Sequence, residues 1–340
     1  MTVPDAPPRA RPAAALAAGG AVALGLAIGA TGERTLLGAA VLWAEPLLVA
    51  LALQGAAWLW AGGRRGAAVG LVATVALSVA AVHRPAPLLV APDTAIDPSL
   101  VDCVNLAPRV RAPVRAVVWA PSADPPAAAL DALRQADPDL IVLSGLADGA
   151  AGEVLAAGLG GEARHVGGPA GGLSVVVRGR FAACGAETAW ATPIPDGGDD
   201  SALALLLPEV RDAGQVPLVV ARLSRPGAPR DWPGWPDRVI AGARAVAALS
   251  GALGSRRTLA IVDAGVPRTF SRVEGHLRGG GLDAVGTPAT WPARLGPLPG
   301  LPLHALQQVH AGDVWSAARA RLLTLDAGPT APLWVELDPG

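Results

Sequence analysis

Three long apolar segments open the chain, and they constrain its fold more than any other feature. They occupy residues 13–30, 36–60 and 66–82. Each is close to the ~20 residues with which a helix crosses the hydrocarbon layer of a membrane. We therefore predict a membrane anchor of three transmembrane helices in residues 1–82. The second helix carries Glu45 beside Pro46, and a carboxyl group at membrane depth indicates either a functional role or burial in its protonated form.

The arginines that flank these segments predict their orientation. Arg9 and Arg11 precede the first segment, and Arg64 and Arg65 lie in the second loop. Since cytoplasmic loops carry an excess of basic residues, the amino terminus and the second loop are expected in the cytoplasm. The protein is then a multi-pass cell-membrane protein whose carboxyl-terminal domain is extracytoplasmic. A secretory signal peptide is the alternative for the first segment.

Beyond residue 82 the pattern changes from a linker to a mixed domain. Residues 83–111 are rich in proline and lack periodicity, which is typical of a linker. Residues 112–338 alternate short apolar runs with helical patterns, which indicates an α/β domain. Strands are predicted at 114–119, 140–144, 173–177, 203–207, 217–223, 258–262, 303–309 and 333–337, and helices at 126–135, 150–158, 236–253 and 271–278.

Charge and cysteine content exclude several classes of function. The formal net charge is -1, which gives no field for non-specific nucleic-acid binding, so no nucleic-acid partner is expected. Cys103 and Cys184 are the two cysteines; they cannot form a zinc ribbon, and outside the cytoplasm they form either one bridge or two free thiols. Trp232 and Trp235 lie in a proline-rich stretch, where they face a lipid or sugar or else pack in the core.

Two motifs carry a resemblance to a known family. The sequence DPDLIVL spans residues 137–143, and GGLDAVGTPATWP spans residues 280–292. Together with the order of the predicted elements and the preceding apolar segments, they make the chain resemble the endonuclease/exonuclease/phosphatase superfamily. The resemblance is to its membrane-anchored bacterial members, which are similar to teicoplanin-resistance membrane proteins. It covers residues 112–338 and implies three transmembrane helices followed by a four-layer α/β sandwich.

The resemblance implies a metal-assisted hydrolysis of phosphate esters, but few of the side chains that this chemistry needs stand at the corresponding positions of the chain. In that chemistry a Glu and an Asn bind a divalent ion, an Asp orients water, and histidines neutralise developing charge. Ala120 or Pro121 stands at the Asn position, Gly145 at the Glu position and Arg222 at the position of a histidine. Asp263 is kept, but its following Asn is replaced by Gly265.

The closing motifs are also replaced. The Asp-His pair of the penultimate strand matches Leu303-His304-Ala305, and the final Ser-Asp-His falls on Gly328-Pro329-Thr330. Of the family's catalytic positions, Asp263 alone is retained. Removal of the Glu, the Asn and the closing Asp-His leaves no oxygen cage for Mg²⁺, so no metal and no other cofactor is predicted.

We therefore predict a catalytically degenerate binding or scaffold module at the cell envelope. Arg222, Asp263 and His304 are expected to line the former active-site pocket, where cationic donors hold an anion without hydrolysing it. The expected partners are the lipid bilayer and either an anionic envelope component or a protein. Two alternatives stay open: a Mg²⁺-dependent phosphohydrolase with a rebuilt site that acts on an envelope phosphate ester, and a purely structural module.

Overall fold

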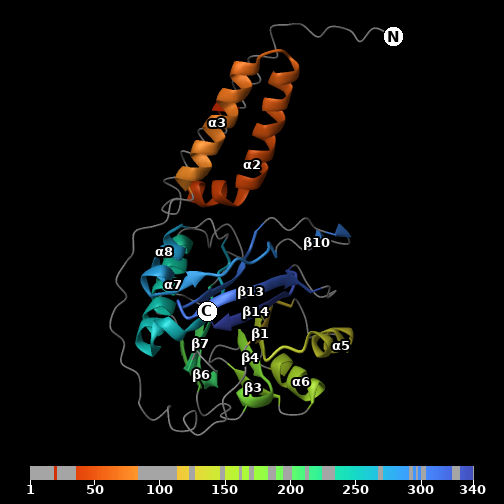
Figure 1. The fold of residues 1–340 in the computed structure, drawn as a ribbon, viewed down its shortest axis with the longest axis vertical. Coiled ribbons are helices and arrows are strands. Elements are labelled where there is room, and N and C mark those ends of the chain that lie inside the picture. Colours follow the sequence, from red (N-terminus) through yellow and green to blue (C-terminus); the bar gives the residue numbers. More distant parts are fainter. Residues whose placement is uncertain are drawn as a thin grey trace. The chain divides into compact units, whose positions relative to one another are not determined.

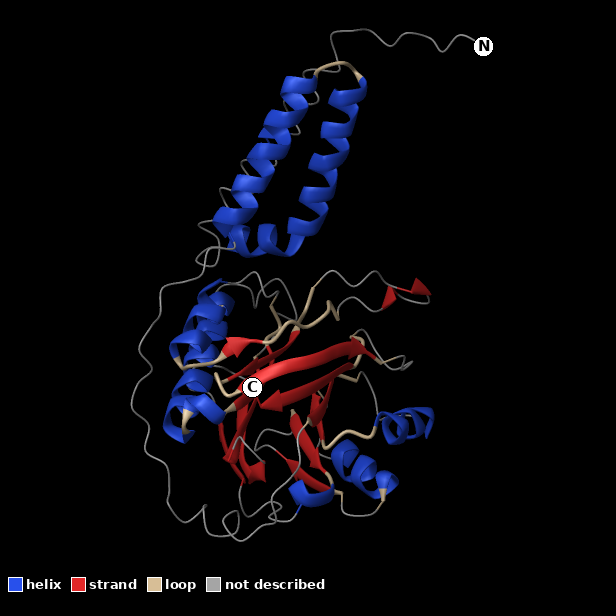
Figure 2. Ribbon diagram, in the orientation of Figure 1, coloured by secondary structure: helices blue, strands red, loops and turns tan. Residues whose placement is uncertain are grey.

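A computed structural model of the 340-residue chain describes most of the polypeptide. The described residues are 19–20, 36–82, 113–121, 127–145, 150–160, 163–167, 172–182, 189–193, 201–210, 214–223, 234–266, 271–290, 294–295, 298–299, 304–323 and 330–339. They fall into two compact units, a helical hairpin and a larger unit of strands and helices (Figures 1 and 2). The predicted linker 83–111, Cys103, Cys184 and the side chain of Glu45 lie outside the described residues.

The first unit is a hairpin of two helices, α2 (Leu36–Ala61) and α3 (Arg65–Val82). Gly63, with a φ of 77°, makes the sharp turn between them, a conformation that glycine adopts without strain. The amide of Arg64 donates to the carbonyl of Leu59 at 2.9 Å and closes the end of α2. Small side chains allow the two helices to pack closely, and the buried ones are Ala52, Ala56, Ala68 and Val75.

The helices α2 and α3 coincide within a few residues with the predicted helices 36–60 and 66–82. Over the part of the chain that the structure describes, no helix is both long enough and apolar enough to cross a membrane. Of the predicted helix 13–30, only Gly19 and Gly20 are described, and both are helical.

The second unit contains two six-stranded sheets. The first runs in the order β13 (Trp315–Leu322), β14 (Leu333–Pro339), β1 (Val114–Trp119), β2 (Leu140–Ser144), β4 (Leu173–Val177) and β3 (Arg164–Gly167). The second runs in the order β5 (Ala189–Pro193), β6 (Ser201–Val210), β7 (Gly214–Arg222), β8 (Leu259–Asp263), β12 (Gln307–Ala311) and β9 (Asp283–Ala284). A short pair, β10 (Arg294–Leu295) and β11 (Leu298–Pro299), stands apart from both sheets.

The two sheets pack face to face over one apolar core. Alternate residues of each strand enter it, because successive side chains of a strand point to opposite faces. In β2, Leu140 and Val142 join this core, whereas Ile141 and Leu143 belong to a second cluster on the outer face. A strand that is buried on both faces reads as a continuous apolar run rather than as an alternation.

Helices cover both outer faces, so the layers follow the order helix, sheet, sheet, helix (Figures 1 and 2). The pair α5 (Ala127–Ala136) and α6 (Ala150–Leu159) packs on the first sheet through Leu133 and Leu155. On the second sheet lies α7 (Trp235–Leu253), which contacts β7, and α8 (Ser271–Gly279) follows beside it. The predicted α/β class is therefore confirmed, and Trp235 is a core residue with 1% of its surface exposed.

Most of the predicted elements are confirmed, and the differences lie in the bounds of several strands and in strands that were not predicted. The strands 114–119, 140–144 and 173–177 have the predicted bounds. The strand predicted at 303–309 instead begins at Gln307, because its buried face carries glutamine and histidine rather than apolar residues. Three strands of four or more residues, β3, β5 and β13, were not predicted.

Candidate functional site

The strand topology brings polar residues to one end of the sandwich. The strands β1 and β2 are parallel neighbours, and so are β7 and β8. Parallel strands end at the same edge of a sheet, which is where ligands bind in many α/β folds. The strand ends concerned carry Ala120, Ser144, Arg222 and Asp263.

Strand alternation directs several of these side chains into the space between the sheets. Ser144, Arg222 and Asp263 each lie two residues after a member of the inter-sheet core, namely Val142, Val220 and Ile261. Gln307 lies two residues before Val309 of the same core and is paired with Asp263 across β12 and β8. By the two-residue period of a strand, all four side chains face the opposite sheet.

A hydrogen bond joins the two sheets at this end. The hydroxyl of Ser144 donates to Oδ2 of Asp263 at 2.8 Å. The two residues are 1% and 5% exposed, respectively. Because a buried carboxylate is costly without donors, this bond is one reason that Asp263 is tolerated between two apolar sheets.

A second group of polar residues connects the ends of β1, β12 and β14. Thr330 Oγ1 donates to the carbonyl of Ala120 at 2.9 Å. The side-chain amide of Gln307, oriented to satisfy both of its neighbours, donates to the carbonyl of Ala331 at 3.2 Å and accepts from the amide of Ala120 at 3.0 Å. Both side chains are almost fully buried. They therefore close the space between the sheets beside the Ser144–Asp263 bond.

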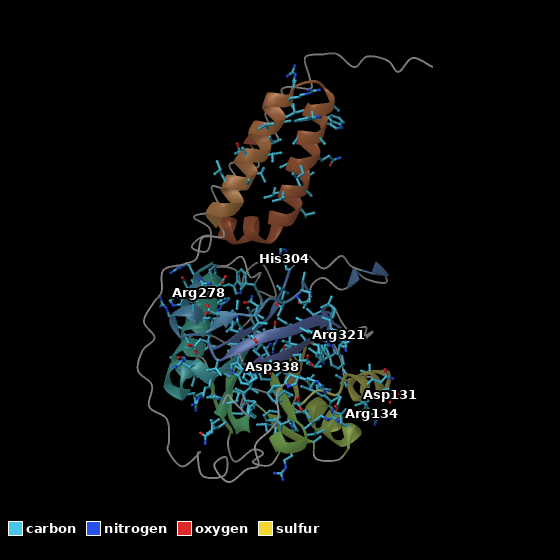
Figure 3. All side chains as sticks on the ribbon, in the orientation of Figure 1. Asp131, Arg134, Arg278, His304, Arg321 and Asp338 are labelled. Atoms are coloured by element: carbon cyan, nitrogen blue, oxygen red, sulfur yellow. The ribbon has the colours of Figure 1, made fainter. Side chains whose placement is uncertain are left out.

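His304 and Thr290 extend this arrangement. The amide of Thr290 donates to the carbonyl of His304 at 2.8 Å, and Thr290 Oγ1 accepts from the amide of Leu306 at 3.3 Å. The carbonyl of Thr290 accepts from Ala331 at 2.9 Å, which links the segment to the start of β14. His304 is 6% exposed and lies near the edge of the α/β unit in Figure 3.

Arg222 is the more exposed charged residue of the site. Its side chain is half-buried, in contrast with that of Asp263. The guanidinium lies against Gly172, where an added Cβ would come within 2.5 Å of Nη1. Gly172 in turn accepts a hydrogen bond from the amide of Gly145 at 2.9 Å, so Arg222 lies over the turn that follows β2. Over the described residues, no ion pair of Arg222 is found.

The described donor groups do not fit a divalent-metal site. Mg²⁺ and Ca²⁺ prefer several oxygen ligands, chiefly carboxylates. At these strand ends Asp263 supplies a carboxylate, but Ala120 and Gly145 supply no side-chain ligand. Within the described ranges no group of three or more His, Cys, Asp or Glu residues lies close enough to hold a metal ion. Leu303 and Pro329 lie outside those ranges.

The structure brings together two of the three predicted site residues directly. Arg222 and Asp263 are register partners in β7 and β8. His304 lies at the same end, but the register partner of Asp263 across β12 and β8 is Gln307, three residues later. Ser144, Gln307 and Thr290 were not predicted from the sequence. Their signal was a polar residue at an inward-facing strand end, which can be read only when the register of the strands is known.

Comparison with known proteins gives a likeness to solved structures. No family model matches the chain, and no curated protein matches it. An endonuclease/exonuclease/phosphatase from Beutenbergia cavernae shares 16% identity, with 67% of this chain and 72% of that chain covered and a TM-score of 0.48. The mannosyl-6-phosphatase of Bacteroides thetaiotaomicron shares 12% identity, with coverages of 66% and 99% and a TM-score of 0.47. The human Nocturnin catalytic domain shares 14% identity, with coverages of 67% and 94% and a TM-score of 0.47.

Proposed function

We propose that the α/β unit is a non-hydrolytic binding module and that Arg222 contacts its anionic ligand. The observation that carries this proposal is the internal hydrogen bonding of the strand ends. Ser144 is bonded to Asp263, and Thr330 and Gln307 are bonded to backbone groups of the first sheet. Polar groups that hold the two sheets together in this way are committed to the fold, which favours a structural role for them over a catalytic one.

Phosphate-ester hydrolysis needs groups that these positions do not provide. It requires a metal or an equivalent charge clamp, an oriented nucleophile and assistance to the leaving group, each worth orders of magnitude in rate. Ala120 and Gly145 contribute no side-chain ligand, and Thr330 is bonded to the carbonyl of Ala120. The hydrolytic alternative therefore has less support than binding.

Arg222 supports an anionic ligand. A guanidinium offers a planar fork of donors that matches phosphate and carboxylate groups. The side chain is half-buried, and its guanidinium lies against Gly172. We therefore propose a phosphorylated envelope component as the ligand.

Thermal unfolding of the full chain in detergent, with and without inorganic phosphate or glycerol phosphate, tests the binding. Wild-type protein should be stabilised by the phosphate, as any ligand that binds the folded state stabilises it. Arg222→Gln should lose this stabilisation. Gly172→Ala should reduce it while keeping every charge, because the new methyl group displaces the guanidinium. Arg256→Gln, at an exposed arginine paired with Asp313, is the matched control. Stabilisation that persists in Arg222→Gln would overturn the assignment of Arg222.

Hydrolysis of a phosphodiester and of a lipid pyrophosphate with Mg²⁺ or Mn²⁺ tests the other half of the proposal. We expect no metal-dependent turnover, no change on Asp263→Asn, and no activity from Gly145→Glu. Gly145 has a φ of 90°, so the substitution is also strained. Turnover that requires the metal and vanishes in Asp263→Asn would establish the phosphohydrolase instead.

We further propose that the helical hairpin is embedded in a lipid bilayer, with the α/β unit on the outer side. The support comes from exposed apolar surface rather than from helix length. Of the nine large apolar side chains that are exposed in the described residues, eight lie on α2 and α3, among them Leu47, Trp58 and Leu77. Such a concentration of exposed apolar side chains is rare on a protein that faces water.

The excess of arginine in the turn between α2 and α3 supports the orientation. Protease added to intact cells should therefore degrade the chain beyond residue 82 and spare the Gly62–Arg65 turn. Protection of the α/β unit in intact cells, with degradation only after lysis, would reverse the orientation.

A further inference from the structure

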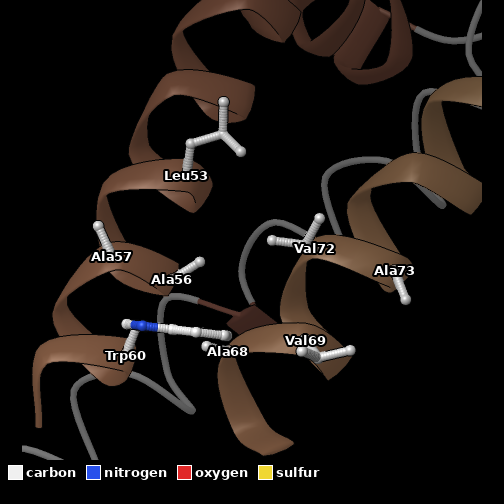
Figure 4. Close-up of a pocket in the computed structure, with 8 residues that line it drawn as sticks. All are labelled: Leu53, Ala56, Ala57, Trp60, Ala68, Val69, Val72 and Ala73. Atoms are coloured by element: carbon white, nitrogen blue, oxygen red, sulfur yellow. The ribbon is translucent and has the colours of Figure 1, made fainter. Parts of the chain in front are cut away.

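A groove runs between α2 and α3, and its walls are apolar. Its volume is about 470 Å³, and it is lined by alanines at four positions and by Leu53, Trp60, Val69 and Val72 (Figure 4). Because the side chains of these alanines are small, they leave the groove unfilled. Leu53, Trp60 and Val69 are each more than half exposed, at 51%, 53% and 58%. The groove is therefore open along its length to whatever surrounds the hairpin.

The opposite side of the hairpin already has a neighbour. A Cβ added at Gly19 would lie 3.3 Å from Leu71, and one added at Gly55 would lie 3.6 Å from it. Residues two apart in an α-helix point about 200° away from each other, so Leu71 faces away from Val69 and Ala73 of the groove. Gly19 therefore lies on the Leu71 side of α3 and not on the side of Val69 and Ala73.

Positive charge is concentrated at one end of the groove. Arg64 and Arg65 are the two basic residues of residues 36–82, and both are exposed. The guanidinium carbon of Arg65 lies 5.5 Å from the centre of the Trp60 ring. Trp60 therefore lies between the apolar groove and the arginines, the position in which an indole is stable at the boundary of a membrane.

We propose that this groove binds an acyl chain of an anionic phospholipid and that Arg64 and Arg65 hold its phosphate group. The inference rests on the membrane association proposed above. An acyl chain matches the apolar walls, and a guanidinium binds a phosphate through paired donors. Basic residues beside a membrane segment select anionic lipids by charge. A second helix in the groove would account for the apolar walls alone, whereas an anionic lipid matches both the walls and the charge of the paired arginines at their end.

Native mass spectrometry of the full chain, released from detergent after incubation with phosphatidylglycerol or phosphatidylcholine, tests the proposal. Wild-type protein should retain phosphatidylglycerol in preference to phosphatidylcholine. The double variant Arg64→Gln/Arg65→Gln should lose this preference, with ~30-fold weaker retention of the anionic lipid. Ala57→Phe should fill the groove and reduce retention of both lipids while keeping the hairpin apolar. Leu77→Phe, at an exposed position of α3 that does not line the groove, is the matched control.

Two different failures can be distinguished by vesicle flotation of the same proteins. If wild-type protein does not float with vesicles of either lipid, the membrane association is wrong and the lipid site with it. If it floats but retains both lipids equally, or if the double arginine variant retains phosphatidylglycerol as wild type does, the lipid site alone is overturned. A dimer that forms in wild type and is lost in Ala57→Phe would make the groove a protein interface and would also overturn it.

Discussion

Ser144 and Asp263 are 119 residues apart in the chain, and their side chains form a buried hydrogen bond of 2.8 Å between the ends of β2 and β8. These strands belong to different sheets, so the bond fixes the two sheets to each other at the end where Arg222 lies. The same end is closed by Gln307 and Thr330, which bond to the backbone of Ala120. The site is therefore built largely from contacts that stabilise the sandwich.

Ser144→Ala should destabilise the protein, because it removes a donor from a buried carboxylate. The expected loss in free energy of unfolding is about 1–3 kcal/mol, measured by denaturant unfolding of the full chain. Ser316→Ala removes an exposed hydroxyl that is bonded to the carbonyl of Asp338, and it should cost much less. Equal losses in free energy of unfolding for the two substitutions would show that the buried Ser144–Asp263 bond does not stabilise the protein more than an exposed one.

Gly280→Ala should separate α7 from α8. An added Cβ would lie 2.8 Å from both Cα and Cβ of Ala247 and 2.9 Å from its carbonyl oxygen, so backbone must move. Overpacking of this kind costs about 1–3 kcal/mol, measured as a lower midpoint of thermal or denaturant unfolding. Gly286→Ala, in the same sequence motif, has no atom within 4 Å of the added carbon and should leave the midpoint unchanged. Equal loss of stability in both variants would show that the close approach of Ala247 to Gly280 is not the cause.

His276 should make the protein less stable as the pH falls below neutrality. Burial lowers the pKa of His276 below its usual range, and the charges of Arg244 and Arg272 lower it further. Its Nε2 lies 3.3 Å from Nε of Arg244, where the neutral ring accepts a hydrogen bond. The folded state therefore binds a proton less readily than the unfolded chain, whose histidine titrates near ~6.5. The contribution of His276 to stability is fully present above the pKa of the unfolded chain, and it is lost as the pH falls through the lower pKa of the folded state.

The variant His276→Gln, which can still accept from Arg244, should lose less stability than wild type between neutral and mildly acidic pH. Unfolding measured at a series of pH values tests this. Arg244→Met removes one of the charges that lower the pKa, and it should reduce the pH dependence in part. A pH dependence identical in wild type and His276→Gln would rule out His276 as its source.

The elements that could be predicted from the sequence are those whose residues are buried on both faces. The strands β2 (LIVLS) and β4 (LSVVV) are continuous apolar runs, and both are buried throughout. The strand β13 reads WSAARARL and was missed, because its arginines suit an edge strand that meets solvent on one side. The fully buried strand β12 contains polar residues, and its start was predicted at residue 303 instead of Gln307.

The candidate site could be predicted only in part. Arg222 and Asp263 were predicted from the resemblance, because they stand at two motif positions of the superfamily, and the structure makes them register partners. Ser144 and Gln307 were not predicted, because their roles depend on bonds to Asp263 and to Ala120, which are distant from them in the sequence. The glycines of GGLDAVG contributed to the resemblance, and the structure explains why glycine stands at two of these positions. Gly280 leaves room for the close approach of Ala247, and Gly281 has a φ of 77°.

Asp139 provides a test with the opposite dependence on pH. Burial raises the pKa of its carboxyl group above the usual range, although a hydrogen bond from the amide of Arg115 and the charges of Arg115 and Arg178 oppose this. The Arg115 amide lies 2.8 Å from Oδ2. The folded state therefore takes up a proton at a higher pH than the unfolded chain, whose aspartate titrates near ~3.9. The contribution of Asp139 to stability is greatest below that pH and falls as the pH rises through the folded-state pKa.

Asp139→Asn keeps an acceptor for the Arg115 amide and removes the charge. Relative to wild type, its free energy of unfolding should rise between acidic and neutral pH, as measured by denaturant unfolding across that range. Asp137→Asn is the matched control, since Asp137 pairs with the same arginines but its side chain is 69% exposed; it should show no such rise. If Asp139→Asn is instead least stable relative to wild type at neutral pH, the arginine charges outweigh burial and the carboxylate is a net stabilising ion.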